Sequence, residues 1–159
     1  MAKKKKAVKP KQEECIEIFT DGSCLKTGAG GWGALIKYPD GNRVAVSGNE
    51  KFTTAPAMEV KAVVEALKTI KEPSNIKIVL DCEYVSKGTN TWIHNWEKND
   101  FRNWKKKLVA HDSAWRKISK MKQFHKKIKC EHVNSHCSSS PTENLIVDIL
   151  AKDAALSVE

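Results

Sequence analysis

The apolar run Cys15-Ile-Glu-Ile-Phe-Thr-Asp21 ends on a carboxylate and sets the architecture expected for the chain. Its alternation of apolar and polar side chains is typical of a β-strand with one face against a core. A second such run, Ile76-Lys-Ile-Val-Leu-Asp81, also ends on an aspartate. If the two strands lie parallel and adjacent, Asp21 and Asp81 meet at the topological switch point, where α/β folds place their sites.

The segments around these two runs predict a mixed sheet. The glycine-rich stretch 22–31 lacks the Lys-Ser/Thr of a phosphate-binding P-loop and leads into a strand, so it predicts a turn. The other elements are expected in this order: strands at 32–38 and 43–48, a helix from Pro56 to Pro73, a strand at 76–81, short helical pieces over 83–96, a helix over 112–124 capped by Asp112 or Ser113, a strand at 128–133 and a helix over 142–156. This β-β-β-α-β-α-β-α order implies an α/β fold with a five-stranded mixed sheet and helices on both faces.

Two further carboxylates interrupt the apolar stripes of predicted helices. Glu59 lies on the stripe that continues with Ala62 and Val63, and Asp148 lies within Leu145-Ile-Val-Asp-Ile-Leu150. An ionised carboxylate on a core-facing surface is costly unless a positive charge compensates it. Four such groups therefore predict a divalent metal site. Oxygen ligands suit Mg²⁺ or Mn²⁺ rather than zinc, and two such ions can promote phosphodiester cleavage.

The charge of the chain is unevenly placed. The formal net charge is +9, yet residues 1–12 carry six lysines and residues 98–129 carry a net of +10, which leaves the remainder acidic. A charged run is often only a solvated surface. Here it is interleaved with aromatic residues, which suits nucleic acid. The aromatic residues in question are Trp92, Trp96, Phe101, Trp104 and Trp115.

Length and composition predict a basic disordered tail over residues 1–14 and one globular domain over residues 15–159. No apolar run approaches the length of a membrane span, the lysine-rich start is no secretory signal, and five cysteines show no spacing typical of a disulfide scaffold. We expect an intracellular, cytoplasmic monomer without membrane association. The lysine-rich tail also allows a nuclear location.

A second metal constellation is an alternative to consider. Cys130 and His132 would share a strand face, and His136 and Cys137 follow in the next loop. Their spacing matches no common zinc module, so we do not expect a structural zinc site.

Several short motifs occur in a fixed order along residues 15–155. They are Phe19-Thr-Asp-Gly-Ser23, Met58-Glu59, Asp81 with Tyr84-Val85, Trp92-Ile-His-Asn-Trp96, and His136 followed by Asp148. In this order and spacing they resemble type 1 ribonuclease H. The resemblance implies a ribonuclease H-like fold, with residues 15–159 as the catalytic domain. It also implies a metal-dependent endonuclease that hydrolyses the RNA strand of RNA–DNA hybrids with two Mg²⁺ ions, or Mn²⁺ in their place, and leaves 5′-phosphomonoesters.

The resemblance also implies roles for particular residues. The metal ligands would be Asp21, Glu59, Asp81 and Asp148, and His136 would assist proton transfer or product release. The basic segment after Trp92 would grip the hybrid. The nucleic-acid-binding residues would be Thr54, Tyr84, Trp92, Lys98, Arg102, Trp104, Lys105, Lys106 and Lys107.

The chain departs from the family's pattern around the site. Type 1 enzymes usually carry Asn-Asn or Asn-Gln shortly before the helix glutamate, where this chain has Thr54-Ala-Pro-Ala-Met-Glu59. Cys82 replaces the serine that usually follows the third carboxylate, and His111 stands where an asparagine is common. We therefore expect retained cleavage with weaker or broader substrate discrimination, because recognition of RNA depends on contacts to its 2′-hydroxyls.

Two other functions fit the same sequence. One is a non-catalytic hybrid-binding module, and the other is a nuclease or strand transferase of the same broad fold that acts on DNA. The presence of all four carboxylates favours catalysis over the first, and the short chain disfavours the second, because such enzymes usually carry additional DNA-binding domains.

Overall fold

Strand β1 (Cys15–Cys24) is the middle strand of the sheet in the computed structural model, which describes residues 14–135 and 138–159. The strand order is β3-β2-β1-β4-β5. β1 pairs antiparallel with β2 (Gly30–Lys37) and parallel with β4 (Asn75–Leu80). β3 (Arg43–Glu50) pairs antiparallel with β2, and β5 (Lys127–His132) pairs parallel with β4. The predicted five-stranded mixed sheet is confirmed.

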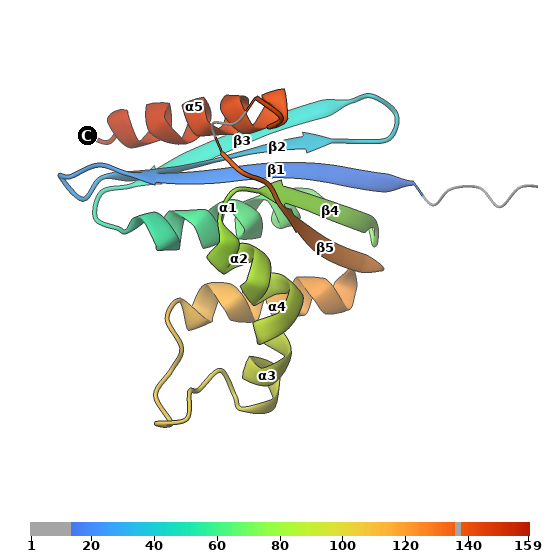
Figure 1. Cartoon of the computed structure of the whole chain (residues 1–159), viewed down its shortest axis with the longest axis vertical. Coiled ribbons are helices and arrows are strands. Elements are labelled where there is room, and N and C mark those ends of the chain that lie inside the picture. Colours follow the sequence, from blue (N-terminus) through green and yellow to red (C-terminus); the bar gives the residue numbers. More distant parts are fainter. Residues whose placement is uncertain (1–13, 136–137) are drawn as a thin grey trace, which may run out of the picture.

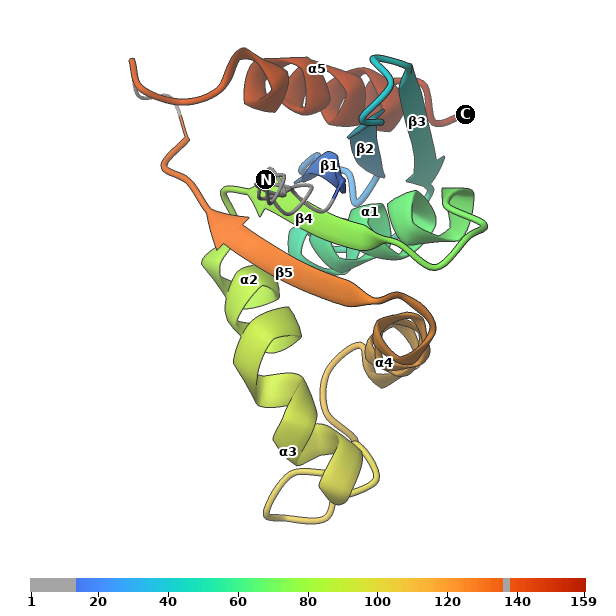
Figure 2. The same cartoon turned by 90° about the vertical axis from the view of Figure 1, so that its right-hand side faces the viewer.

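Helices cover both faces of this sheet, as predicted. α5 (Thr142–Leu156) lies on one face, over β1, β2 and β3, whereas α1 (Ala55–Thr69) lies on the other with α4 (Asp112–Phe124) beside it (Figures 1 and 2). Alternate residues of a strand point to opposite faces. Ile18 accordingly belongs to the core on the α1 side, and its neighbour Phe19 packs with Val147 of α5. Both faces of β1 are therefore buried.

A continuous helical segment follows β4. It consists of α2 (Glu83–Lys87), the π-helical turn η1 (Gly88–Trp92) and α3 (Ile93–Lys98), and it extends away from the sheet (Figure 1). The loop after α3 lies farthest from the sheet and returns to α4 (Figure 2). This segment confirms the helical pieces predicted over 83–96 and contains a π turn that the sequence did not predict.

Two local predictions are wrong. The turn expected over 22–31 is shorter, because β1 continues to Cys24 and β2 already begins at Gly30. The extra pairing needs glycine: a Cβ on Gly31 would lie 2.2 Å from the Ala151 carbonyl oxygen of α5. The N-cap of α4 is His111, in a left-handed conformation with φ of 59°, and not Asp112 or Ser113.

The predicted tail falls almost entirely on residues 1–13, which lie outside the described residues. Within the described part of the chain, no helix combines the length and the apolar character that a membrane crossing requires. The cysteines at positions 15, 24, 82 and 130 are free thiols.

Candidate metal centre and its surroundings

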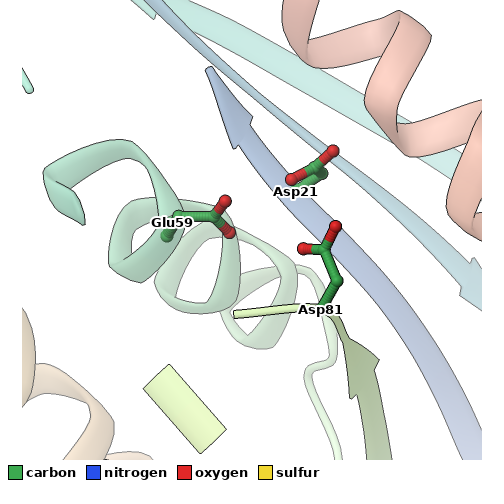
Figure 3. Close-up of side chains that lie close together, drawn as sticks. All are labelled: Asp21, Glu59 and Asp81. Atoms are coloured by element: carbon green, nitrogen blue, oxygen red, sulfur yellow. The ribbon is translucent and has the colours of Figure 1, made fainter. Parts of the chain in front are cut away.

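Three carboxylates from separate elements meet at one edge of the sheet. Asp21 lies within β1, Asp81 directly follows β4, and Glu59 lies in the second turn of α1. One carboxylate oxygen of each lies within 4.8 Å of those of the other two, and the three groups face one another in Figure 3. Among the described residues, no other set of three or more histidine, cysteine, aspartate or glutamate side chains could hold a metal ion in this way.

The backbone explains why these groups converge. β1 and β4 run parallel with Phe19 opposite Val79, so Asp21 and Asp81 follow at equivalent positions. Glu59 reaches the same point because α1 lies directly against β1. A Cβ on Gly22 would be 2.5 Å from the Glu59 backbone nitrogen, so only glycine permits this approach.

Burial and like charge make the cluster electrostatically unfavourable without a cation. Asp21 is only 7% exposed. Its burial and the neighbouring Asp81 charge raise the pKa of Asp21 to about 7. Burial and the Asp21 charge raise the pKa of Glu59 to about 9. These carboxyl groups therefore hold protons near neutral pH, unless a cation takes the place of those protons.

The donor set fits a hard divalent cation. Carboxylate oxygens are the ligands that Mg²⁺ and Mn²⁺ prefer. The Oε2 atom of Glu59 is buried and has no hydrogen-bond partner among the described residues, which is costly unless a ligand completes the site.

The fourth predicted ligand, Asp148, lies beside this group rather than within it. It is close enough to contribute to the raised pKa of Asp21. Its Oδ2 accepts a hydrogen bond of 3.0 Å from Lys152 Nζ, one turn further along α5. The sequence did not single out Lys152, although a lysine four residues after a predicted ligand on a helix is a recognisable pairing signal.

A pocket next to the carboxylates contains a further polar group that the sequence analysis missed. Asp81 and Asp148 line it together with Asn144 and Ser140. Both side-chain amide atoms of Asn144 are buried without a hydrogen-bond partner among the described residues. The predicted catalytic histidine, His136, lies outside the described residues, so its role stays a prediction.

The zinc alternative gains no support. Cys130 is buried, and burial raises the pKa of its thiol to about 11, which disfavours the thiolate that zinc requires. Nε2 of His132 lies 3.2 Å from the Asp81 carbonyl oxygen. The other two residues of that set, His136 and Cys137, lie outside the described residues.

A row of aromatic rings lies on the helical segment after Asp81. The Tyr84 and Trp92 ring centroids are 6.1 Å apart, and Trp92 and Trp96 are separated by the same distance. Trp92 is 37% exposed, so it can contact a ligand. The Tyr84 hydroxyl accepts a hydrogen bond from Trp115 Nε1 at 3.1 Å, which fixes the ring at the N-terminal end of the row.

Two of the aromatic residues expected on the basic surface instead belong to the core. Trp115 is fully buried and Phe101 is 6% exposed. The guanidinium of Arg116 lies over the Phe101 ring, with 4.7 Å between its Cζ and the ring centroid. The prediction that these two rings interleave with surface lysines is therefore wrong, because hydrophobic burial outweighs the basic character of their sequence neighbours.

The loop between α3 and α4 carries the remaining predicted contacts. Trp104 is 87% exposed, and Lys105 Nζ lies 5.0 Å from its ring centroid. Arg102 donates a hydrogen bond to the Lys106 carbonyl oxygen, and Asn103 Oδ1 accepts from the backbone N–H groups of Lys105 and Lys107. These bonds give the loop a defined shape, and Lys98 is exposed where α3 ends.

Thr54 has a structural use that the sequence did not predict. Its hydroxyl oxygen accepts a hydrogen bond from the Ala57 N–H at 3.3 Å and so caps α1. The hydroxyl hydrogen remains able to donate to a ligand. Ala55 and Pro56 form the first turn of this helix and offer no side-chain amide there.

Sequence comparison places these features in a wider group of proteins. The profile of the RNase H family matches residues 13–156. A protein named Ribonuclease H from Nitrosospira multiformis is 42% identical over 145 residues, which is 91% of each chain.

Solved structures share the same fold. The solution structure of the PFV RNase H domain has a TM-score of 0.75 and 25% identity, and the match covers 93% of this chain and 98% of that one. A foamy viral protease-reverse transcriptase in complex with RNA/DNA hybrid has a TM-score of 0.78 and 25% identity. That match covers 99% of this chain but 23% of the viral chain.

Proposed function

Because this chain belongs to the ribonuclease H family, we propose that it is a metal-dependent endonuclease that cleaves the RNA strand of RNA–DNA hybrids. The observation that carries this proposal is the convergence of Asp21, Glu59 and Asp81 within 4.8 Å at the sheet edge. The viral relative in complex with RNA/DNA hybrid supports the choice of substrate.

Asp21, Glu59, Asp81 and Asp148 would hold two Mg²⁺ ions, for which Mn²⁺ can substitute. When bound, such ions supply an activated water and stabilise the leaving oxygen of the phosphodiester, which yields a 5′-phosphomonoester. Asp21 and Glu59 would hold the ions in their deprotonated form, and bound cations would offset the burial and repulsion that raise the pKa of each group. Lys152 forms an ion pair with Asp148, and a cation bound to Asp148 would compete with this pair.

The remaining residues would position the hybrid and clear the product. Tyr84 and Trp92 present ring faces to the DNA strand, and Thr54 offers its hydroxyl to a phosphate. The basic loop after α3 would contribute Lys98, Arg102, Trp104, Lys105, Lys106 and Lys107. His136 would assist proton transfer or product release.

Hybrid selectivity should be weaker than the family pattern implies. Ala55 and Pro56 begin α1 beside Thr54, where the pattern has amide side chains. Without amides at this position, fewer groups are available to contact 2′-hydroxyls. We therefore propose efficient cleavage of hybrid with measurable activity on a second duplex type.

The test compares end-labelled RNA–DNA hybrid, RNA duplex and DNA duplex, each with Mg²⁺ and with Mn²⁺. We expect cleavage of the RNA strand of the hybrid, and we expect Asp81→Asn to abolish turnover while the protein stays folded by circular dichroism. Absence of hybrid cleavage at every metal concentration would leave a binding module as the better description. Preferential cleavage of DNA duplex would favour a DNA-acting nuclease of the same fold.

A further inference from the structure

One extra residue in the helical segment after Asp81 aligns two of its aromatic rings. In a regular helix of 3.6 residues per turn, residue 92 lies about 80° around the axis from residue 84. The π turn over Gly88–Trp92 accommodates one additional residue, which turns residue 92 back by about 100° and leaves it about 20° from residue 84 on the opposite side. Tyr84 and Trp92 therefore face the same side, with their ring centroids 6.1 Å apart.

The buried Trp115 ring packs against Tyr84 and against the backbone of the π turn. A Cβ on Gly88 would be 2.4 Å from the Trp115 ring, so glycine lets this buried indole pass beneath the π turn. Trp115 also donates its Nε1–H to the Tyr84 hydroxyl. Tyr84 is thus fixed by the core, whereas Trp92 depends on the π turn for its direction.

The Asn90 side chain joins this π turn to the edge strand of the sheet. Its Nδ2 donates to the Cys130 carbonyl oxygen at 2.8 Å, and its Oδ1 accepts from the Cys130 N–H at 2.9 Å. Cys130 lies opposite Ile78 of β4 in the parallel register, and its N–H and C=O both point away from β4 toward Asn90. The amide therefore occupies the place of a missing neighbouring strand on β5.

A second side chain supports the same turn. Lys122 of α4 donates a hydrogen bond from Nζ to the Thr89 carbonyl oxygen. Burial lowers the pKa of Lys122, as expected for an ammonium drawn beneath the helix. An isolated π turn is less favourable than a regular helix and persists where its surroundings hold it. Asn90 and Lys122 provide that support from β5 and from α4.

We propose that Asn90 is a positioning residue that holds the π turn and thereby directs Trp92 toward the DNA strand of a bound hybrid. This inference rests on the proposed function. Asn90 itself acts through Trp92, and its anchor on β5 couples the aromatic row to the sheet that carries Asp81. Without the anchor, the turn can relax to a regular helix, which rotates Trp92 by about 100° relative to Tyr84.

The first test is Asn90→Ala, with Thr91→Ala as the matched control on the same turn, where the side chain is exposed. We expect Asn90→Ala to raise KM for the hybrid about fivefold to tenfold, part of the loss expected for one stacking contact, with kcat changed less than about twofold. Thr91→Ala should leave both unchanged. A lowered melting temperature with an unchanged KM would mean that Asn90 only stabilises the edge strand, and would overturn the proposal.

A double-mutant cycle distinguishes an effect of Asn90 on hybrid binding by itself from an effect that operates through the Trp92 ring. If Asn90 acts through that ring, the KM effects of Asn90→Ala and Trp92→Ala should not add in the double variant. Additive effects would overturn the proposal. If Asn90→Ala fails to fold, Asn90→Asp keeps the acceptor for the Cys130 N–H and loses the donor, and its KM should lie between those of the wild type and Trp92→Ala.

A spectroscopic arm needs neither substrate nor metal. Nuclear Overhauser contacts between the Trp92 indole and the Tyr84 ring should be present in the wild type and in Thr91→Ala, and weakened in Asn90→Ala. Retention of these contacts in Asn90→Ala would overturn the positioning role. If the wild type neither binds nor cleaves hybrid, but Asn90→Ala still weakens these contacts, the role of Asn90 in the π turn stands and the proposed function is removed instead.

Discussion

Gly22 of β1 lies against Glu59 of α1 so closely that a Cβ on the glycine would be 2.5 Å from the Glu59 nitrogen and 2.6 Å from the Met58 carbonyl carbon. The neighbour of Gly22 is Asp21, whose Oδ1 accepts a hydrogen bond from the Gly22 N–H at 2.9 Å. The lack of a side chain at Gly22 therefore lets β1 and α1 approach closely enough to bring Asp21 and Glu59 together.

Gly22→Ala should separate Glu59 from Asp21 and Asp81. The added methyl group meets backbone atoms that cannot rotate away, so α1 must shift. We expect a loss of about 1–3 kcal/mol in the free energy of unfolding, measured by denaturant titration. We also expect Mg²⁺ to bind about tenfold more weakly or worse by calorimetry, which corresponds to about 1.4 kcal/mol.

Gly41→Ala is the control for this prediction. Gly41 lies in an exposed hairpin turn at φ of +93°, where an added Cβ meets no atom within 4 Å. Alanine in this conformation should cost about 1–2 kcal/mol of stability and leave Mg²⁺ affinity unchanged. Equal loss of Mg²⁺ affinity in both variants would show that general destabilisation, rather than the close approach at Gly22, controls the site.

Without metal, the carboxylate cluster should make the protein less stable as the pH rises. The pKa of Asp21 is raised to about 7 and that of Glu59 to about 9, both above their unfolded values near 4. The folded state then binds more protons than the unfolded state between about pH 5 and pH 9, so the free energy of unfolding falls across this range. Thermal melts in the presence of a chelator should show this decline.

The same linkage predicts how Mg²⁺ and Asp21→Asn act. Mg²⁺ should raise the melting temperature more at pH 8 than at pH 6, because it must displace protons that occupy the carboxylates more fully at low pH. At pH 8 without metal, Asp21→Asn should be more stable than the wild type by on the order of 1 kcal/mol or more, with little difference at pH 5. A variant less stable than the wild type at pH 8 would contradict the repulsion argued for the cluster.

The sequence was sufficient for the sheet, the main helices and the meeting of Asp21 with Asp81, because these depend on local alternation and on strand ends. Asp21 and Asp81 end apolar runs, and parallel pairing alone brings them together. The sequence did not reveal the tertiary requirements. The close approach at Gly22 depends on backbone atoms of α1, and the packing at Gly88 depends on the Trp115 ring. No local sequence pattern indicates either contact. Phe101 and Trp115 were misplaced for the same reason.

The lysines of the loop after α3 should govern affinity for the hybrid rather than the chemical step. Changing Lys105, Lys106 and Lys107 to alanine should raise KM more than it lowers kcat. It should also reduce the slope of log affinity against log salt concentration by up to about 3, because fewer counterions are released from the nucleic acid. Fluorescence anisotropy of a labelled hybrid at several salt concentrations measures this slope.

A matched set of three lysines serves as the control. Lys126, Lys127 and Lys129 are exposed at the start of β5, at the opposite end of that strand from Asp81. Their replacement by alanine should leave the salt slope nearly unchanged. If both triple variants reduce the slope equally, the net charge of the protein and not the loop controls binding.

The contribution of His125 to the free energy of unfolding should fall as the pH falls, whereas that of Asp21 and Glu59 falls as the pH rises. The side chain is 4% exposed at the end of α4, and its Nδ1 accepts a hydrogen bond of 3.2 Å from the Ser74 N–H before β4. Burial lowers the pKa of His125 below its ordinary value of 6.5. The unfolded state therefore binds the proton first as the pH falls, and stability that is complete above pH 6.5 is lost below it.

His125→Asn isolates this contribution, because the asparagine Oδ1 can accept the same hydrogen bond and does not titrate. The stability of the wild type relative to this variant should decrease by at most about 2 kcal/mol between pH 7 and pH 5, measured by denaturant titration at each pH. The exposed His94 provides the control, since His94→Asn should show no such trend. A constant difference between wild type and His125→Asn across this range would mean that His125 accepts its proton as easily in the folded state as in the unfolded chain.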